Sequence, residues 1–187
     1  AISELIEYYK GIFTTLSSCA SRQLEEVTFR RATISVPELM ATAGKYFRKV
    51  YKGNKAHIDF KIQPLEGRIT GDWNQLRFLL ENLIDEACSV TLDGAVCLSA
   101  REDGEFIRFL FTDMRREKTR EELNQLFYPD LSRMTAGEKG ELYGTEYLVC
   151  KQIIRDHDEF AGRRGCRINA EPGKEGGFTI YFTLPKK

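Results

Sequence analysis

Hydrophobic and polar positions alternate with two different periods along the chain, and this pattern predicts a mixture of helices and strands. A helix with Pro37 in its first turn is expected to reach about Tyr51 and to stop at Gly53. A longer helix is expected to begin at Asp72, whose side chain can cap it, because apolar residues then recur every three or four positions as far as Ala87. Two further helices are expected at residues 120–127 and 145–157.

Alternating apolar residues between these helices predict strands, and the Asp103-Gly104 pair between two of them is a strong hairpin signal. The expected strands are residues 33–35, 57–62, 96–101, 105–111, 166–170 and 178–184. Strands that alternate with helices and end in hairpins imply an α+β fold. We therefore expect a two-layer α/β sandwich, in which a mixed sheet carries helices on one face, preceded by an N-terminal helix.

Residues 2–24 have apolar positions at alternating steps of three and four, which is the spacing of an amphipathic helix with a seam of coiled-coil type. Such a helix either lies on its own domain or forms half of a dimeric helical bundle, and we favour the second, a homodimer. Because the chain begins in this pattern without a methionine, we expect it to be part of a longer protein. The expected division is residues 1–32 as helix and linker and residues 33–187 as one domain.

Composition narrows the possible partners. The 187 residues include 28 Lys+Arg and 28 Asp+Glu, so the net charge is zero and the basic footprint of a nucleic-acid binder is missing. No stretch approaches the roughly 20 apolar residues of a membrane span, so we expect no direct membrane contact in this fragment. The five cysteines show no paired CxxC spacing, which favours reduced, mostly buried thiols. They are Cys19, Cys88, Cys97, Cys150 and Cys166.

Four segments, taken in order, place polar residues or glycines on one face of a predicted helix or at the ends of predicted elements. In the first, Asn82 and Glu86 lie four positions apart and so on one face of a helix. In the second, Asp113 ends a predicted strand, and in the third, Gly144 precedes a helix. The segments are residues 71–87 (GDWNQLRFLLENLIDEA), 111–129 (FTDMRREKTREELNQLFYP), 142–154 (LYGTEYLVCKQII) and 176–185 (GGFTIYFTLP).

In this order the four segments resemble the nucleotide-binding motifs of sensor histidine kinases, whose ATP-binding domain belongs to the superfamily that also includes Hsp90, gyrase B and MutL. The resemblance covers about residues 33–185. It implies the Hsp90-like two-layer fold, ATP and Mg²⁺ as cofactors, and the receiver domain of a response regulator as a partner. It also implies a cytoplasmic location, which includes the cytoplasmic part of a membrane-bound sensor.

The resemblance assigns roles to individual residues. The family's first motif presents two asparagines to the triphosphate and its magnesium, and Asn82 and Glu86 stand at those places. Asp113 stands where the family's aspartate receives the adenine amino group, and Thr179 stands where a threonine often lines the adenine pocket. The residues thereby assigned to the cofactor are Asn82, Glu86, Asp113, Gly144, Thr145 and Thr179, of which Asn82 and Glu86 would also bind the metal.

Five positions depart from the family pattern, in which they are asparagine or glycine: Glu86, Arg115, Glu117, Leu142 and Glu146. Glycines at the strand end let backbone approach the nucleotide, and side chains at Arg115 and Glu117 oppose that approach. An acidic residue in the first turn of a helix competes with phosphate for the helix N-terminus. We therefore predict a degenerate nucleotide site in a domain that acts in signal relay or partner docking.

Two other functions stay open. In the first, the domain is an active histidine kinase: Asn82 and Glu86 bind Mg-ATP, residues 131–142 close as a lid, and the phosphate goes to an upstream histidine. Residues 2–24 contain no histidine, and neither His57 nor His157 is expected to be the acceptor. In the second, the same fold binds a transcription regulator or phosphorylates serine.

Overall fold

The computed structural model describes residues 2–6, 29–128 and 147–187. Its helices are α2 (Val36–Tyr51), α3 (Trp73–Ser89), α4 (Arg120–Gln125) and α5 (Leu148–Phe160). Its strands are β1 (Ala32–Ser35), β2 (Ile58–Gln63), β3 (Arg68–Gly71), β4 (Gly94–Asp103), β5 (Phe106–Asp113), β6 (Ile168–Pro172) and β7 (Phe178–Pro185).

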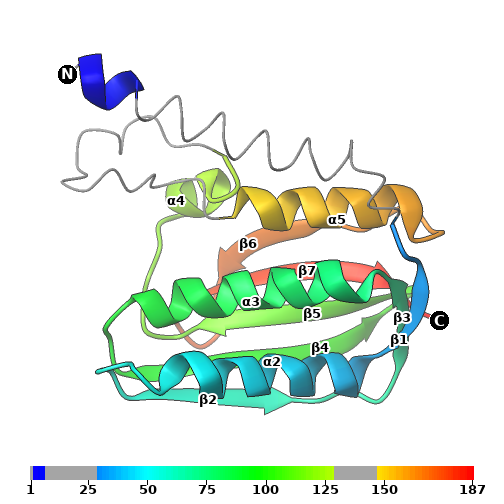
Figure 1. Cartoon of the computed structure of the whole chain (residues 1–187), viewed down its shortest axis with the longest axis horizontal. Coiled ribbons are helices and arrows are strands. Elements are labelled where there is room, and N and C mark those ends of the chain that lie inside the picture. The colour runs from blue at the N-terminus through cyan, green and yellow to red at the C-terminus, as the bar shows by residue number, and fades with distance from the viewer. Residues whose placement is uncertain (1, 7–28, 129–146) are drawn as a thin grey trace.

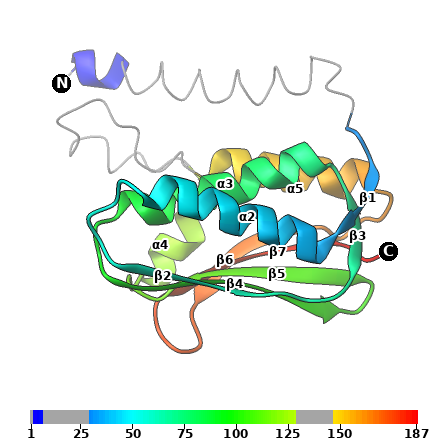
Figure 2. The ribbon, with the colours of Figure 1, turned by 60° about the horizontal axis from the view of Figure 1, so that its bottom comes forward.

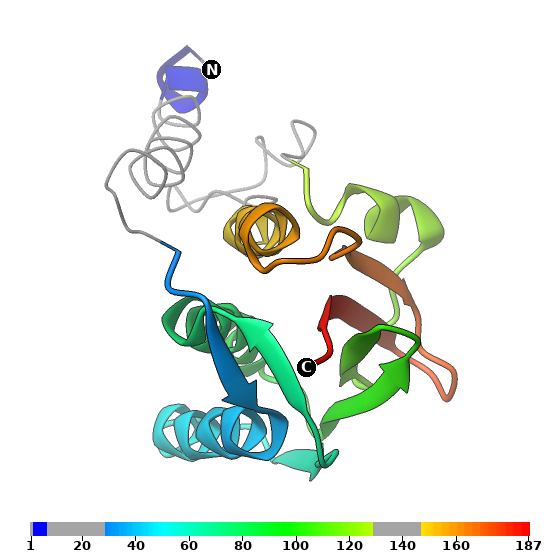
Figure 3. The same ribbon diagram turned by 90° about the vertical axis from the view of Figure 1, so that its right-hand side faces the viewer.

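Five strands form a mixed sheet with the order β2-β4-β5-β7-β6, in which β2 runs parallel to β4 and every other neighbouring pair is antiparallel. Helices α2, α3 and α5 lie side by side on one face of this sheet (Figure 1 and Figure 2). The view from the end of the molecule separates the helix layer from the sheet layer (Figure 3). The predicted α+β fold with helices on one face is confirmed.

The core lies between the two layers. Phe109 of β5 and Phe182 of β7 are fully buried, and their rings stack with centroids 5.0 Å apart. Leucines of α3 at helical spacing, such as Leu76 and Leu83, are buried against them in the same cluster. The apolar residues that recur with the period of each element therefore form the face that this element buries.

Strand β3, which was not predicted, pairs antiparallel with β1 in a separate two-stranded sheet. This strand has only four residues, and its partner lies far back along the chain, so local alternation could not reveal it. The predicted hairpin is present, with Gly104 at φ 60° in the turn between β4 and β5. Of the predicted helix at residues 2–24, residues 2–6 are described and helical, and the rest lies outside the described residues.

The predicted cap of α3 is present, and α2 also begins at a capping side chain. Ser35 accepts a hydrogen bond from the backbone N–H of Glu38 at the start of α2 (3.4 Å). Asp72 accepts one from the backbone N–H of Gln75 at the start of α3 (3.1 Å). These caps fix where α2 and α3 begin.

Candidate functional site: a strand end filled by its own arginine

Asp113, the residue expected to recognise adenine, ends β5 and is buried, with a side chain only 1% exposed. Both of its carboxylate oxygens are occupied by Arg115, whose Nε donates to Oδ1 and whose Nη2 donates to Oδ2, each at 3.0 Å. The backbone N–H of Arg115 also donates to Oδ1, and Arg116 donates to Oδ2 at 3.3 Å. A two-point arginine–carboxylate pair of this kind is among the stronger charge-assisted interactions in proteins.

The guanidinium of Arg115 also reaches the end of α3, because the loop after β5 lies beside that helix end. Its Nη1 donates to the carbonyls of Val90 and Leu92 at 3.1 and 2.9 Å, and its Nη2 donates to the carbonyl of Ala87 at 2.5 Å. Helix α3 has no basic residue in its own last turn, so Arg115 supplies the positive charge that favours a helix C-terminus. Arg115 is therefore buried between a carboxylate and a row of carbonyl oxygens.

Space for this side chain depends on Gly94, the first residue of β4. A Cβ atom at that position would lie 2.8 Å from Cγ of Arg115, and the backbone there has φ 137°, which other residues rarely adopt. Gly94 thus has no side chain on the side where Arg115 runs toward α3. The arginine fits a space that the surrounding backbone leaves for it.

Glu117, at the second position where the family has glycine, also makes an ordered contact. Its Oε1 accepts a hydrogen bond from the backbone N–H of Gly177 at 2.9 Å. Nearby, the cationic groups of Arg116 and Lys118 lie 5.5 and 5.3 Å from the ring centre of Phe178, which is buried. Both replaced glycine positions therefore hold side chains that bond to the strand ends around them.

The other predicted site residues lie on neighbouring elements. Asn82 and Glu86 are both half-buried on α3, one turn apart. Thr179 is buried on β7, where its hydroxyl shares a 2.8 Å hydrogen bond with that of Thr112, the residue before Asp113. Their assignment to a cofactor stays a prediction. Gly144 and Thr145 lie outside the described residues, as do Leu142, Glu146 and the proposed lid at 131–142.

The donor set around Asp113 does not fit the family's adenine contact, because the carboxylate that would accept the amino group already accepts from Arg115. For Mg²⁺, Asn82 and Glu86 offer an amide and a carboxylate oxygen, which are ligand types that this ion accepts. The described part of the chain contains no group of three or more His, Cys, Asp or Glu side chains that could hold a metal by themselves. Metal binding here would therefore need water molecules or phosphate oxygens as additional ligands.

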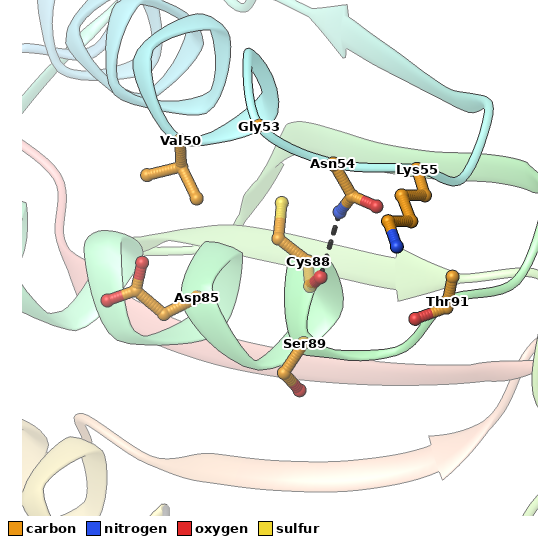
Figure 4. Close-up of a pocket in the computed structure, with 8 residues that line it drawn as sticks. All are labelled: Val50, Gly53, Asn54, Lys55, Asp85, Cys88, Ser89 and Thr91. Carbon is orange, nitrogen blue, oxygen red and sulfur yellow. Dashed lines mark hydrogen bonds between the residues drawn. The ribbon is translucent and has the colours of Figure 1, made fainter.

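Two cavities lined by described residues lie elsewhere, and neither is lined by Asp113. One, of about 490 Å³, lies where the ends of α2 and α3 meet; there the Asn54 side chain donates to the Cys88 carbonyl at 2.8 Å (Figure 4). Burial raises the pKa of the Cys88 thiol, although the charge of Arg115 acts in the opposite direction. The other cavity, of about 260 Å³, lies between α4 and β6.

Comparison with known proteins agrees with this architecture. A sequence profile of the family described as histidine kinase-, DNA gyrase B-, and HSP90-like ATPases matches residues 71–187. The chain belongs to this family, and the resemblance to sensor histidine kinase ATP-binding domains is confirmed. None of the helices in the described part of the chain is both long and apolar enough to cross a membrane.

The chain is 26% identical over 177 residues to the adaptive-response sensory kinase SasA of Thermosynechococcus vestitus. This match covers 93% of the chain and 44% of the relative, so the chain spans less than half of that protein's length. Among solved structures, the catalytic domain of histidine kinase ThkA superposes with a TM-score of 0.64 at 18% identity, covering 84% of this chain and 96% of that one. Full-length ShkA in complex with AMPPNP superposes with a TM-score of 0.69 at 17% identity, covering 96% of this chain and 36% of that one.

Proposed function

We propose that this chain is the ATP-binding-type domain of a two-component sensor histidine kinase whose nucleotide site has degenerated, and that it acts in signal relay or partner docking. The observation that carries the proposal is the buried pair between Asp113 and Arg115. The carboxylate expected to select adenine is already saturated by a side chain of the same loop. ATP and Mg²⁺ are then not required for its role.

A comparison of free energies supports this proposal over ordinary ATP binding. An adenine amino group could reach Asp113 only by displacing Arg115, which would leave a buried guanidinium without its carboxylate. Breaking one partner from a buried pair costs about 3–5 kcal/mol. A ligand that binds at millimolar concentration has only about 4 kcal/mol of binding free energy. The displacement would therefore consume most of the free energy with which ATP could bind at that strength.

We also propose that residues 1–32 are the end of a dimerisation helix and its linker, and that residues 33–187 are the domain which that helix connects to a sensor. The proposed partners are a second copy of the chain through the N-terminal helix and the receiver domain of a response regulator. Histidine kinase ThkA, with which this chain superposes at a TM-score of 0.65, has been solved in complex with a response regulator protein, TrrA.

One observation favours an alternative, an active Mg-ATP-dependent kinase that phosphorylates an upstream histidine. Asn82 and Glu86 lie one turn apart on α3, so that an amide and a carboxylate oxygen share one face of the helix. In phosphoryl transfer the protein mainly positions groups and neutralises charge, so these residues could serve if a nucleotide were held by other contacts.

Calorimetric titration of Mg-ATP into the whole chain separates the two proposals. The degenerate site predicts no saturable heat at millimolar ATP. Saturable binding in that range, abolished by Asp113→Asn, would contradict the degenerate site, whereas no detectable binding would contradict the active kinase. The asparagine variant is the matched control because it keeps the size of the side chain and removes the charge.

A further inference from the structure

We propose that Arg115 is a built-in occupant of the adenine end of the site, where its guanidinium group takes the place of a planar ligand. This inference rests on the proposed function and adds a second role: the same group caps α3, so that the fold around the site depends on the arginine. The ligand class that the space accepts is a small planar cation with N–H donors on several edges.

The hydrogen-bond geometry carries the inference. An arginine side chain has five N–H donors in a fixed plane. Its five side-chain hydrogen bonds here run from Nε to Asp113, from Nη1 to Val90 and Leu92, and from Nη2 to Asp113 and Ala87. The acceptor count equals the donor count. The acceptors therefore form a socket whose shape and charge match a guanidinium group.

The environment explains why the arginine stays in this socket. The side chain is 1% exposed, so water cannot replace the bonds that it makes. The acceptors come from the end of β5, from the end of α3 and from the loop that follows α3, and the carbonyls lie 23 to 28 positions before the arginine in the chain. Arg115 consequently connects the end of β5 to the end of α3 and its following loop.

Removal of the side chain would leave a socket that is negatively charged and lined by carbonyl oxygens. A free guanidinium ion has the same plane and the same donors as the group removed, and it should re-enter the socket. Sodium, which has the same charge but no N–H donors, should not replace it. This difference distinguishes a shaped site from simple charge screening.

The test uses the whole chain with Arg115→Gly, which introduces the residue that the family has at this position. We expect a lower melting temperature than that of the unsubstituted chain, and a saturable rise on addition of millimolar guanidinium chloride but not of equimolar sodium chloride. The matched control is Arg116→Gly, in the same loop, since Arg116 makes one 3.3 Å contact to Asp113 and is 22% exposed. We expect the melting temperature of that control to fall by less, and not to rise on addition of guanidinium chloride.

Equal melting temperatures for the two glycine variants, or no response of Arg115→Gly to guanidinium, would overturn the inference. If Arg115→Gly does not fold, Arg115→Lys carries the test, because lysine keeps the charge but lacks the planar set of donors. A lysine variant as stable as the unsubstituted chain would overturn the inference, and a clearly less stable one supports it. Mg-ATP binding by the unsubstituted chain would instead overturn the proposed function, so the two failures are distinguishable.

Discussion

The Nε2 atom of His157 accepts a hydrogen bond from the backbone N–H of Asp72 at 3.0 Å, and this bond joins α5 to the start of α3. Since Nε2 accepts, the proton lies on Nδ1, which donates to the carbonyl of Ile153 at 2.7 Å. The Asp72 carboxylate in turn accepts from the backbone N–H of Arg30 at 2.9 Å, and the ring of Phe29 packs on His157 at 4.7 Å. One buried imidazole therefore connects α5, α3 and the residues that lead into the domain.

Replacement of this imidazole should destabilise the domain strongly. We expect His157→Ala to lower the free energy of unfolding by about 2–4 kcal/mol, because it removes a fully buried ring and leaves the Asp72 N–H without its acceptor. Urea unfolding measures the change. His57→Ala is the matched control, since His57 is exposed and should alter stability by no more than about 0.5 kcal/mol. Equal effects of the two variants would contradict the connecting role.

A second prediction concerns Gly94 and Arg115, which compete for space. Gly94→Ala should lower the free energy of unfolding through both its backbone conformation and its clash with the arginine. In the presence of Arg115→Ala the clash disappears and only the backbone part remains. A double-mutant cycle in urea should therefore show a coupling of about 0.5–3 kcal/mol between the two sites.

The control for this cycle is Gly53→Ala, because a Cβ there would have nothing within 4 Å. We expect its effect to be independent of Arg115. Strict additivity of Gly94→Ala and Arg115→Ala would show that the two positions do not share space.

Alkaline stability should depend on Tyr46. Burial, followed by its hydrogen bond to Asp85, raises the pKa of Tyr46 from 10.0 to about 12. A group whose pKa is raised in the folded state contributes stability that is complete below its unfolded pKa and lost as pH rises through the folded one. The fall in stability between pH 10 and pH 12 should therefore be shallower in Tyr46→Phe than in the unsubstituted chain. Equal slopes of stability against pH in the two chains would refute this dependence.

The thiols should differ in reactivity. Burial, with a further contribution from Asp158, raises the pKa of Cys166 to about 12, so this thiol is almost fully protonated at neutral pH. We expect iodoacetamide near neutral pH to label the less buried Cys88 and Cys97 before Cys166, as read by mass spectrometry of peptides. Denaturation should abolish the difference. Prior labelling of Cys166 in the folded chain would contradict the packing around it.

The fold was largely predictable from local pattern, because each helix and most strands bury one periodic face. The caps at Ser35 and Asp72 follow from their side chains and the helices after them. Strand β3 was not predictable, since its four residues are held by pairing with β1. The bond between Asp72 and His157 spans 85 positions and had no local signal either.

The position of the candidate site was predictable from the sequence, but the hydrogen bonds that Arg115 makes there were not. The sequence showed Arg115 and Glu117 where the family has glycine, and we expected them to obstruct a nucleotide. That Arg115 would turn back onto Asp113 and cap α3 depends on the end of α3 meeting the end of β5, which is a tertiary feature. An arginine two positions after a strand-ending aspartate was the only local signal.

Our central claim is that Arg115, and not a nucleotide, donates the hydrogen bonds that the Asp113 carboxylate accepts. NMR of the arginine side chain tests this claim most directly. The Nε–H of Arg115, buried and bonded to the carboxylate, should give a signal protected from exchange with water, absent from Arg115→Lys. We expect this signal to keep its position and intensity when Mg-ATP is added to millimolar concentration. A saturable shift or loss of the signal with Mg-ATP would show that a nucleotide displaces the arginine, and would contradict the account.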